Sequence, residues 1–173
     1  MPEIFRTRDV VVFVKGDTFP VKLNNALLQS GWAGGQLVMW DDATDDDFQV
    51  QYSDGRFGGF LLWGSDEDSD QYVSMVGQQI KYGYAVMAMG GWSISTRTYE
   101  KYTYASRIAG PLVPINYVEG DFLRISLRGL FTVEDEWTLS GDPRAPDHFW
   151  AGVVMHAPDL AKNKDYLGVQ ANL

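Results

Sequence analysis

The sequence predicts an all-β protein, a single-domain antiparallel barrel or sandwich of about nine or ten strands with at most one short helix. Glycine and proline are frequent, at 18 and 7 of 173 residues, and they divide the chain into short segments. Aromatic residues make up 14% of the chain, which favours strands over helices. Short alternating apolar runs lie between turn residues, and the length suits one well-packed domain.

The N-terminal residues 1–7 are expected to form an extended arm, and residues 8–173 the β domain. The first residues carry Glu3 and Asp9 and lack an apolar core before a small-residue cleavage site, so we expect no signal peptide. Residues 8–15 are predicted to form the first strand, because they contain a short valine-rich apolar run.

The best candidate for a helix is residues 20–30. Pro20 suits a first helical position, three leucines fall on one face, and Gly31 can cap the end. The segment is short, and a loop remains the alternative.

The remaining chain has the pattern of strands and turns. Residues 36–40, 48–52 and 57–63 are predicted to form a three-stranded antiparallel unit. Residues 93–104 alternate hydroxyl, aromatic and charged side chains, which is typical of a half-exposed strand. Apolar alternation predicts the further strands at 72–79, 82–89, 122–127, 150–156 and 166–170.

The net charge of −9 arises from one part of the chain. Residues 41–70 hold ten acidic residues and one arginine, and the rest of the chain holds thirteen of each sign. No basic stripe is present, so nucleic acid is not an expected partner. The acidic loops would repel an anionic membrane surface, and no apolar run reaches the roughly eighteen residues of a membrane span.

The absence of cysteine excludes a disulfide scaffold, a thiol nucleophile and a thiolate metal site. The two histidines, His148 and His156, lack a standard metal spacing. The run Glu134, Asp135 and Glu136 is typical of a solvated loop, with the paired carboxylates of a glycosidase as the alternative.

The acidity lies in two loops, residues 41–47 and 65–70, and the first acidic loop is the candidate for a cation. Calcium binds six to eight hard oxygen ligands, which an aspartate-rich loop can supply. A solvated loop and a docking surface for a basic partner are the alternatives, and no other cofactor is expected. The candidate calcium ligands are Asp41, Asp42, Asp45, Asp46 and Asp47.

Six tryptophans raise the question of an exposed aromatic platform. Trp40 and Trp63 end predicted strands beside the two acidic loops, where a carbohydrate-binding module would present them. Burial in the core is the usual alternative.

Five segments together resemble the head-decoration, or capsid cement, proteins of tailed bacteriophages. The early ones are residues 35–40 (Gly-Gln-Leu-Val-Met-Trp) and 59–64 (Gly-Phe-Leu-Leu-Trp-Gly). The later ones are residues 120–132 (Gly-Asp-Phe-Leu-Arg-Ile-Ser-Leu-Arg-Gly-Leu-Phe-Thr), 150–158 (Trp-Ala-Gly-Val-Val-Met-His-Ala-Pro) and 166–169 (Tyr-Leu-Gly-Val).

The resemblance implies a non-enzymatic virion structural protein that binds the major capsid protein on the outer capsid surface, as a homo-trimer. The arm would attach it by adding a strand to a neighbour's edge, with Ile4 and Phe5 in that strand and Arg6 and Arg8 giving charge-assisted contacts. Deleting residues 1–7 should then abolish attachment with little effect on the thermal midpoint.

Two alternatives remain open: a carbohydrate-binding or adhesion module, and another virion component such as a tail tube or head-completion protein. A decoration protein predicts apolar surfaces and no deep polar pocket, whereas a sugar binder predicts coplanar exposed aromatic rings.

Overall fold

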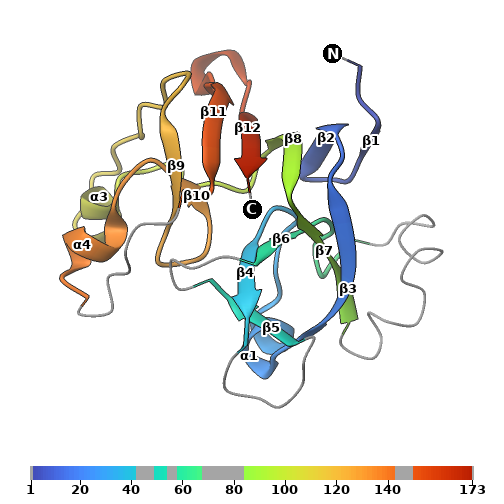
Figure 1. The fold of residues 1–173 in the computed structure, drawn as a ribbon. Helices are drawn as coiled ribbons and strands as arrows, with labels where there is room; N and C mark the ends of the chain where they lie inside the picture. The colour runs from blue at the N-terminus through green and yellow to red at the C-terminus, as the bar shows by residue number, and fades with distance from the viewer. Residues whose placement is uncertain (1, 42–48, 54–57, 68–83, 143–149, 173) are drawn as a thin grey trace.

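A computed structural model describes residues 2–41, 49–53, 58–67, 84–142 and 150–172 (Figure 1). These residues form twelve strands in two groups, a seven-stranded sheet and a closed five-stranded barrel. The all-β prediction is confirmed, but the architecture is a sheet combined with a barrel rather than one barrel or sandwich of nine or ten strands.

The seven-stranded sheet has the order β1-β2-β8-β12-β11-β9-β10, and every neighbouring pair is antiparallel. Its strands are β1 (Phe5–Arg6), β2 (Val10–Val14), β8 (Gly91–Thr96), β9 (Phe122–Ile125), β10 (Phe131–Thr132), β11 (Gly152–His156) and β12 (Leu167–Asn172).

The barrel lies between β2 and β8 in the sequence and has the strand order β3-β5-β4-β6-β7. Strands β3 and β5 pair in parallel, whereas β3–β7, β4–β5, β4–β6 and β6–β7 are antiparallel pairs. Strand β4 pairs with both β5 and β6, which confirms the predicted three-stranded unit. The barrel strands are β3 (Asp17–Leu23), β4 (Leu37–Trp40), β5 (Gln49–Tyr52), β6 (Gly59–Leu61) and β7 (Tyr84–Met89).

A continuous two-stranded ribbon joins the sheet to the barrel. Strand β2 leads into β3 and pairs with β8, while β7 leads into β8 and pairs with β3 (Figure 1). Gly90 makes the link between β7 and β8 with a φ of 84°, a left-handed conformation that favours glycine. On the other strand, a Cβ at Gly16 would lie 2.6 Å from the Trp92 indole nitrogen. Glycine on both strands therefore lets the ribbon pass from one sheet to the other.

Alternate residues of the barrel strands enter two different hydrophobic cores. Phe60 and Val86 pack with sheet residues such as Trp92, and their neighbours Leu61 and Met87 fill the barrel interior. The two cores thus share β6 and β7, because successive side chains of a strand point to opposite faces. One face of the sheet is buried against the barrel by this arrangement.

Three short α-helices and a 3-10 turn complete the described chain, so the prediction of at most one short helix is wrong. They are α1 (Asn25–Ser30), α3 (Tyr104–Ile108), α4 (Glu136–Ser140) and η2 (Leu160–Lys162). No helix among the described residues has the length and apolar character to span a membrane.

The helix predicted at residues 20–30 is half correct. Its second half is α1, which begins after the capping residue Asn24 and ends at Gly31. Its first half is strand, since Pro20 lies in β3 opposite Val86. Pairing with β7 makes this segment a strand, although the local sequence pattern favoured a helix.

The strand predicted at residues 93–104 is also partly wrong. Strand β8 ends at Thr96, and Tyr104 begins α3 with Thr103 as its cap. The predicted strand at residues 72–79 lies outside the described residues.

Candidate functional site

The outer face of the seven-stranded sheet, turned away from the barrel, is the candidate site. The register gives one row across it: Val14, Ser93, Gln170, Val153 and Phe122. The side chains next to them along each strand, such as Val169 and Leu123, are buried in the core. The outward row is half-buried or exposed, and it holds no ionisable side chain.

An exposed aromatic pair lies at the β9 end of this face. The rings of Phe122 and Trp150 are 4.6 Å apart at an angle of 39°, and the two side chains are 56% and 44% exposed. The Arg124 guanidinium lies 4.6 Å from the centre of the Trp150 ring, and its Nη1 is 3.7 Å from Asp135. Tryptophan and arginine dominate the binding energy of many protein interfaces, so this cluster has the composition of an interface centre.

A shallow groove of about 280 Å³ crosses the middle of the same face, over β8, β12 and β11. Phe13 and Met155 flank it, Ser93 and Ser95 form part of its floor, and the backbone at Gly168 adds no side chain. The groove is open and is lined by apolar and hydroxyl groups and by His156.

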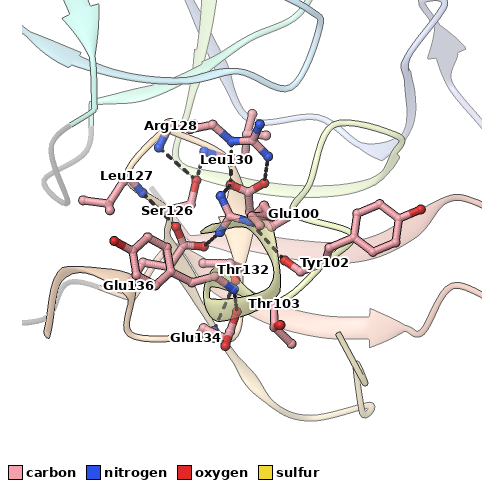
Figure 2. Close-up of polar contacts among 12 residues, drawn as sticks. Glu100, Tyr102, Thr103, Ser126, Leu127, Arg128, Leu130, Thr132, Glu134 and Glu136 are labelled. Atoms are coloured by element: carbon pink, nitrogen blue, oxygen red, sulfur yellow. Dashed lines mark hydrogen bonds and ion pairs between the residues drawn. The ribbon is translucent and has the colours of Figure 1, made fainter. Parts of the chain in front are cut away.

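A buried cluster of charged groups lies beside the turn between β9 and β10 (Figure 2). The side chains of Glu100 and Glu136 are fully buried. Arg107 joins them, with its Nη1 at 3.2 Å from Glu100 and its Nη2 bonded to Glu136. Arg128 donates a second set of bonds to Glu100, including one of 3.1 Å from Nε. The cluster therefore ties α3, α4 and the turn between β9 and β10 to one point.

The contacts of the cluster hold its side chains and the segments around them in position. Burial raises the pKa of Glu136 above its ordinary value, and the bonds from Arg107 oppose that shift. Glu134 accepts a bond of 2.8 Å from the backbone N–H of Tyr104, and Asp135 caps α4. The run Glu134 to Glu136 is thus neither a solvated loop throughout nor an open pair of carboxylates.

The residues expected to form an attachment arm are folded into the sheet. Phe5 and Arg6 form β1, which pairs with β2 and is the edge strand of the sheet in the described chain. Phe5 stacks on Trp63 with ring centres 6.2 Å apart, whereas Ile4 is exposed. Within this chain, main-chain bonds to β2 and the contact of Phe5 with Trp63 hold the segment that was expected to form an extended arm.

Arg6 and Arg8, the arginines expected to give charge-assisted contacts, are both paired within the chain. Arg6 is bonded to Glu3. The Arg8 backbone N–H donates to Glu67, and the Arg8 side chain forms ion pairs with Asp9 and Asp66. Arg8 therefore fastens the start of the second acidic loop to the first strands.

The two tryptophans proposed as a platform do not form one. Trp63 is 3% exposed and lies in the core shared by the sheet and the barrel, so it is not a platform. Trp40 is half-buried against the barrel core.

Of the candidate calcium ligands, only Asp41 is described, and it accepts a bond from the Gln49 side chain. Asp42, Asp45, Asp46 and Asp47 lie outside the described residues. The described part of the chain holds no group of three or more side chains that could bind a metal ion. His156 ends β11 and lies 3.4 Å from Glu119, and His148 is not described.

The sequence contained a signal for the aromatic pair that our predictions did not use. In the strand that begins at Phe122, Leu123 and Ile125 are the inward residues, so Phe122 and Arg124 must face outward. No local pattern indicated that Glu100 is buried. Its partner Arg107 lies on α3, and its partner Arg128 lies in the turn between β9 and β10.

Searches of protein-family models, of curated proteins and of solved structures found no match to this chain.

Proposed function

We propose that the protein is a non-enzymatic virion structural protein, a decoration protein that binds the major capsid protein on the outer surface of a bacteriophage shell and stabilises it. The observation that carries the proposal is the outer face of the sheet, which presents Phe122 and Trp150 beside Arg124. The resemblance to capsid cement proteins supplies the shell as partner and the homo-trimer as the state in which the protein binds.

The aromatic pair is suited to a protein partner. Burying exposed apolar surface contributes roughly 25 cal/mol per Å², and Phe122 and Trp150 both have surface to bury. Arg124 stacks on Trp150 and is paired with Asp135, so it is held in place before a partner arrives. Such preorganisation lowers the entropy cost of binding.

The distribution of charge supports the same orientation. The acidic window, residues 41–70, contains the barrel strands β5 and β6 and the chain around them. The outer face of the sheet is the face that does not contact the barrel. Docking through this face keeps the described strands of that window, β5 and β6, outside the central contact.

Strand β1 gives the N-terminal segment a changed role. The edge of a sheet can accept a strand from a neighbouring chain. Within the described chain β1 pairs with β2 alone, so it offers its other side as such an acceptor. The segment then contributes an edge to the shell contact, not a free arm.

The test is quantitative mass spectrometry of gradient-purified virus particles from the source. A copy number close to that of the major shell protein is expected. A few copies per particle would move the protein to the tail or to head completion, and its absence would overturn a virion role.

Binding to shells that lack the protein then locates the surface. Trp150→Ala should reduce the bound copies at least about tenfold, in line with a central interface residue. Leu28→Ala is the control, because Leu28 is similarly exposed at 43% but lies on α1 at the barrel. Equal binding of both variants would exclude the aromatic pair as the contact.

A carbohydrate-binding or adhesion module remains the second candidate, on the same exposed Trp150. Sugar rings stack best on open, coplanar aromatic faces, whereas these rings are tilted by 39° and Arg124 lies over Trp150. A glycan array with wild-type protein and Trp150→Ala decides: binding that depends on Trp150 would favour this module over capsid decoration.

A further inference from the structure

Arg124 carries the charge of the aromatic cluster, which we define as Phe122, Arg124 and Trp150. Its side chain is 24% exposed, and its guanidinium lies over the Trp150 ring. Nη1 is buried and has no hydrogen-bond partner in the described part of the chain. Nε and Nη2 form no hydrogen bond with the described residues either and, unlike Nη1, they are not buried. A ligand can therefore reach donors of Arg124 that the fold leaves unused.

Asp135 compensates part of the Arg124 charge without using these donors. Its Oδ2 lies 3.7 Å from Nη1, which is an ion pair but too long for a hydrogen bond. Asp135 is instead committed to α4, because it accepts bonds from the Thr138 backbone N–H at 3.3 Å and from the Thr138 hydroxyl at 2.9 Å. The guanidinium thus keeps room for a second carboxylate, as Arg107 does between Glu100 and Glu136.

The other arginines of the described chain have their donors satisfied or open to water. Four of them donate side-chain hydrogen bonds to a carboxylate: Arg6, Arg8, Arg107 and Arg128. Arg97 has only an ion pair of 3.8 Å, but its side chain is 46% exposed, so water can satisfy it. Arg124 differs because it is mostly covered and still lacks an acceptor, which is costly for a charged group.

Docking of the outer face would increase this cost. A partner that covers the exposed rings of Phe122 and Trp150 also removes water from Arg124, and an unpaired charge in a dry contact is strongly unfavourable. The outward row beside the cluster holds no ionisable side chain that could supply the missing charge. The acceptor must then come from the partner. A carboxylate fits best, because the planar guanidinium can donate two parallel bonds to its two oxygens.

We propose that the docking partner places an aspartate or glutamate carboxylate on Arg124, next to apolar groups that cover Phe122 and Trp150. The surface of the partner therefore combines an acidic residue with apolar residues. This inference rests on the proposed function, since it names the chemistry of the shell surface that the outer face meets.

Binding of the full-length chain to shells that lack it tests the pair. The carboxylates of the shell are either left intact or converted to neutral amides with a carbodiimide and glycinamide. On intact shells Arg124→Gln should bind at least about tenfold more weakly than wild type. On blocked shells the two should bind equally, because the group that distinguishes them is gone. Circular dichroism confirms that each variant is folded.

Two further variants separate a specific pair from an effect of net charge. Lys22→Gln removes one positive charge from the barrel strand β3, so it should respond to blocking as wild type does. Arg124→Lys keeps the charge but lacks the planar fork. It should bind intact shells more weakly than wild type and more tightly than Arg124→Gln.

Nuclear magnetic resonance tests the same site in the free protein, without shells. The Nε–H signal of Arg124, identified by its loss in Arg124→Gln, should shift saturably with glutarate and should not shift with neutral glutaramide. The Nε–H signal of Arg128 is the internal control, because this group already donates to Glu100 at 3.1 Å.

The inference is overturned if glutarate leaves the Arg124 signal unchanged. It is also overturned if Arg124→Gln binds intact shells as wild type does, or shows the same deficit on intact and blocked shells. Capsid decoration would stand in each of these cases as long as wild type binds the shells. A saturable response to glutarate without any binding to shells would keep the carboxylate site and remove capsid decoration.

Discussion

Arg107 is the residue that holds the buried charged cluster together, because it pairs with two buried carboxylates at once. Glu100 and Glu136 have fully buried side chains, and Arg107 itself is 16% exposed. We predict that Arg107→Met lowers the free energy of unfolding by about 3–5 kcal/mol, since it leaves two buried carboxylates short of a partner. Guanidinium unfolding measures the change.

Arg97→Met is the control for this prediction. Arg97 forms an exposed ion pair with Asp165 at 3.8 Å, so its loss should cost at most about 1 kcal/mol. Equal effects of the two substitutions would show that the buried cluster has no special weight in stability.

Glu136 predicts a pH dependence. Burial raises its folded pKa above the unfolded value of 4.5, so the folded state holds the proton more tightly. Its contribution to stability is therefore complete below pH 4.5 and is lost as pH rises through the folded pKa. Glu136→Gln does not titrate, so wild type should lose stability relative to this variant as the pH rises above 4.5. Paired urea titrations at each pH measure the difference, and a relative gain by wild type would contradict the raised pKa.

At the scale of elements, the bend between β7 and β8 depends on one glycine. Gly90 has a φ of 84°, in the left-handed region. A Cβ added at either Gly90 or Gly91 would have no neighbour within 4 Å, so steric contact does not distinguish the two positions. Gly90→Ala should therefore cost about 1–2 kcal/mol through backbone strain alone. Gly91→Ala, without the positive φ, should be close to neutral. Thermal unfolding compares them, and an equal loss in both would refute the backbone explanation.

Strand β1 gives a second test at this scale. Phe5→Ala should destabilise the protein by about 1–2 kcal/mol, because Phe5 packs on Trp63 and on the core. Ile4→Ala, at an exposed neighbour, should change stability by less than about 0.5 kcal/mol. Deleting residues 1–7 should accordingly lower the thermal midpoint, in contrast to the behaviour expected of a free arm. No shift in the midpoint would restore the arm.

Local pattern predicted the elements better than it predicted their partners. The alternation that marks β9 and the runs that mark β4 and β7 are properties of consecutive residues, and those strands were found. Pro20 misled the helix prediction because its strand is fixed by pairing with β7, far along the sequence. The spacing of apolar residues within one segment does not show which distant strand will pair with it.

In the candidate site too, local pattern predicts the orientation of some residues, whereas the position of others depends on tertiary packing. That Phe122 faces outward follows from Leu123 facing inward. The burial of Trp63 and Glu100 depends on which elements pack over them, and the pattern around each residue is equally consistent with a loop or a surface strand. The groove likewise requires three strands that are not consecutive in the chain, β8, β12 and β11.

At the scale of the whole molecule, the barrel is inserted between β2 and β8 but is not an independent unit. Phe60 and Val86 of the barrel strands pack in the same core as Trp92 of the sheet. The turn between β9 and β10 is bonded to β4, because the Leu37 N–H and the Gln36 side chain both donate to the Gly129 carbonyl at 2.9 Å. Neither part can unfold without exposing apolar surface of the other.

This shared core predicts a single cooperative unfolding transition. Val50 lies in the barrel interior and Val169 in the core of the sheet, and both are completely buried. Val50→Ala and Val169→Ala should each cost about 2 kcal/mol and lower the same midpoint, by about 4–8 °C at the 2–4 °C per kcal/mol typical of this chain length. Far-UV circular dichroism and tryptophan fluorescence should give coincident curves for wild type and both variants. A second transition that moves only with Val50→Ala would mean that the barrel unfolds separately and that the ribbon alone joins it to the sheet.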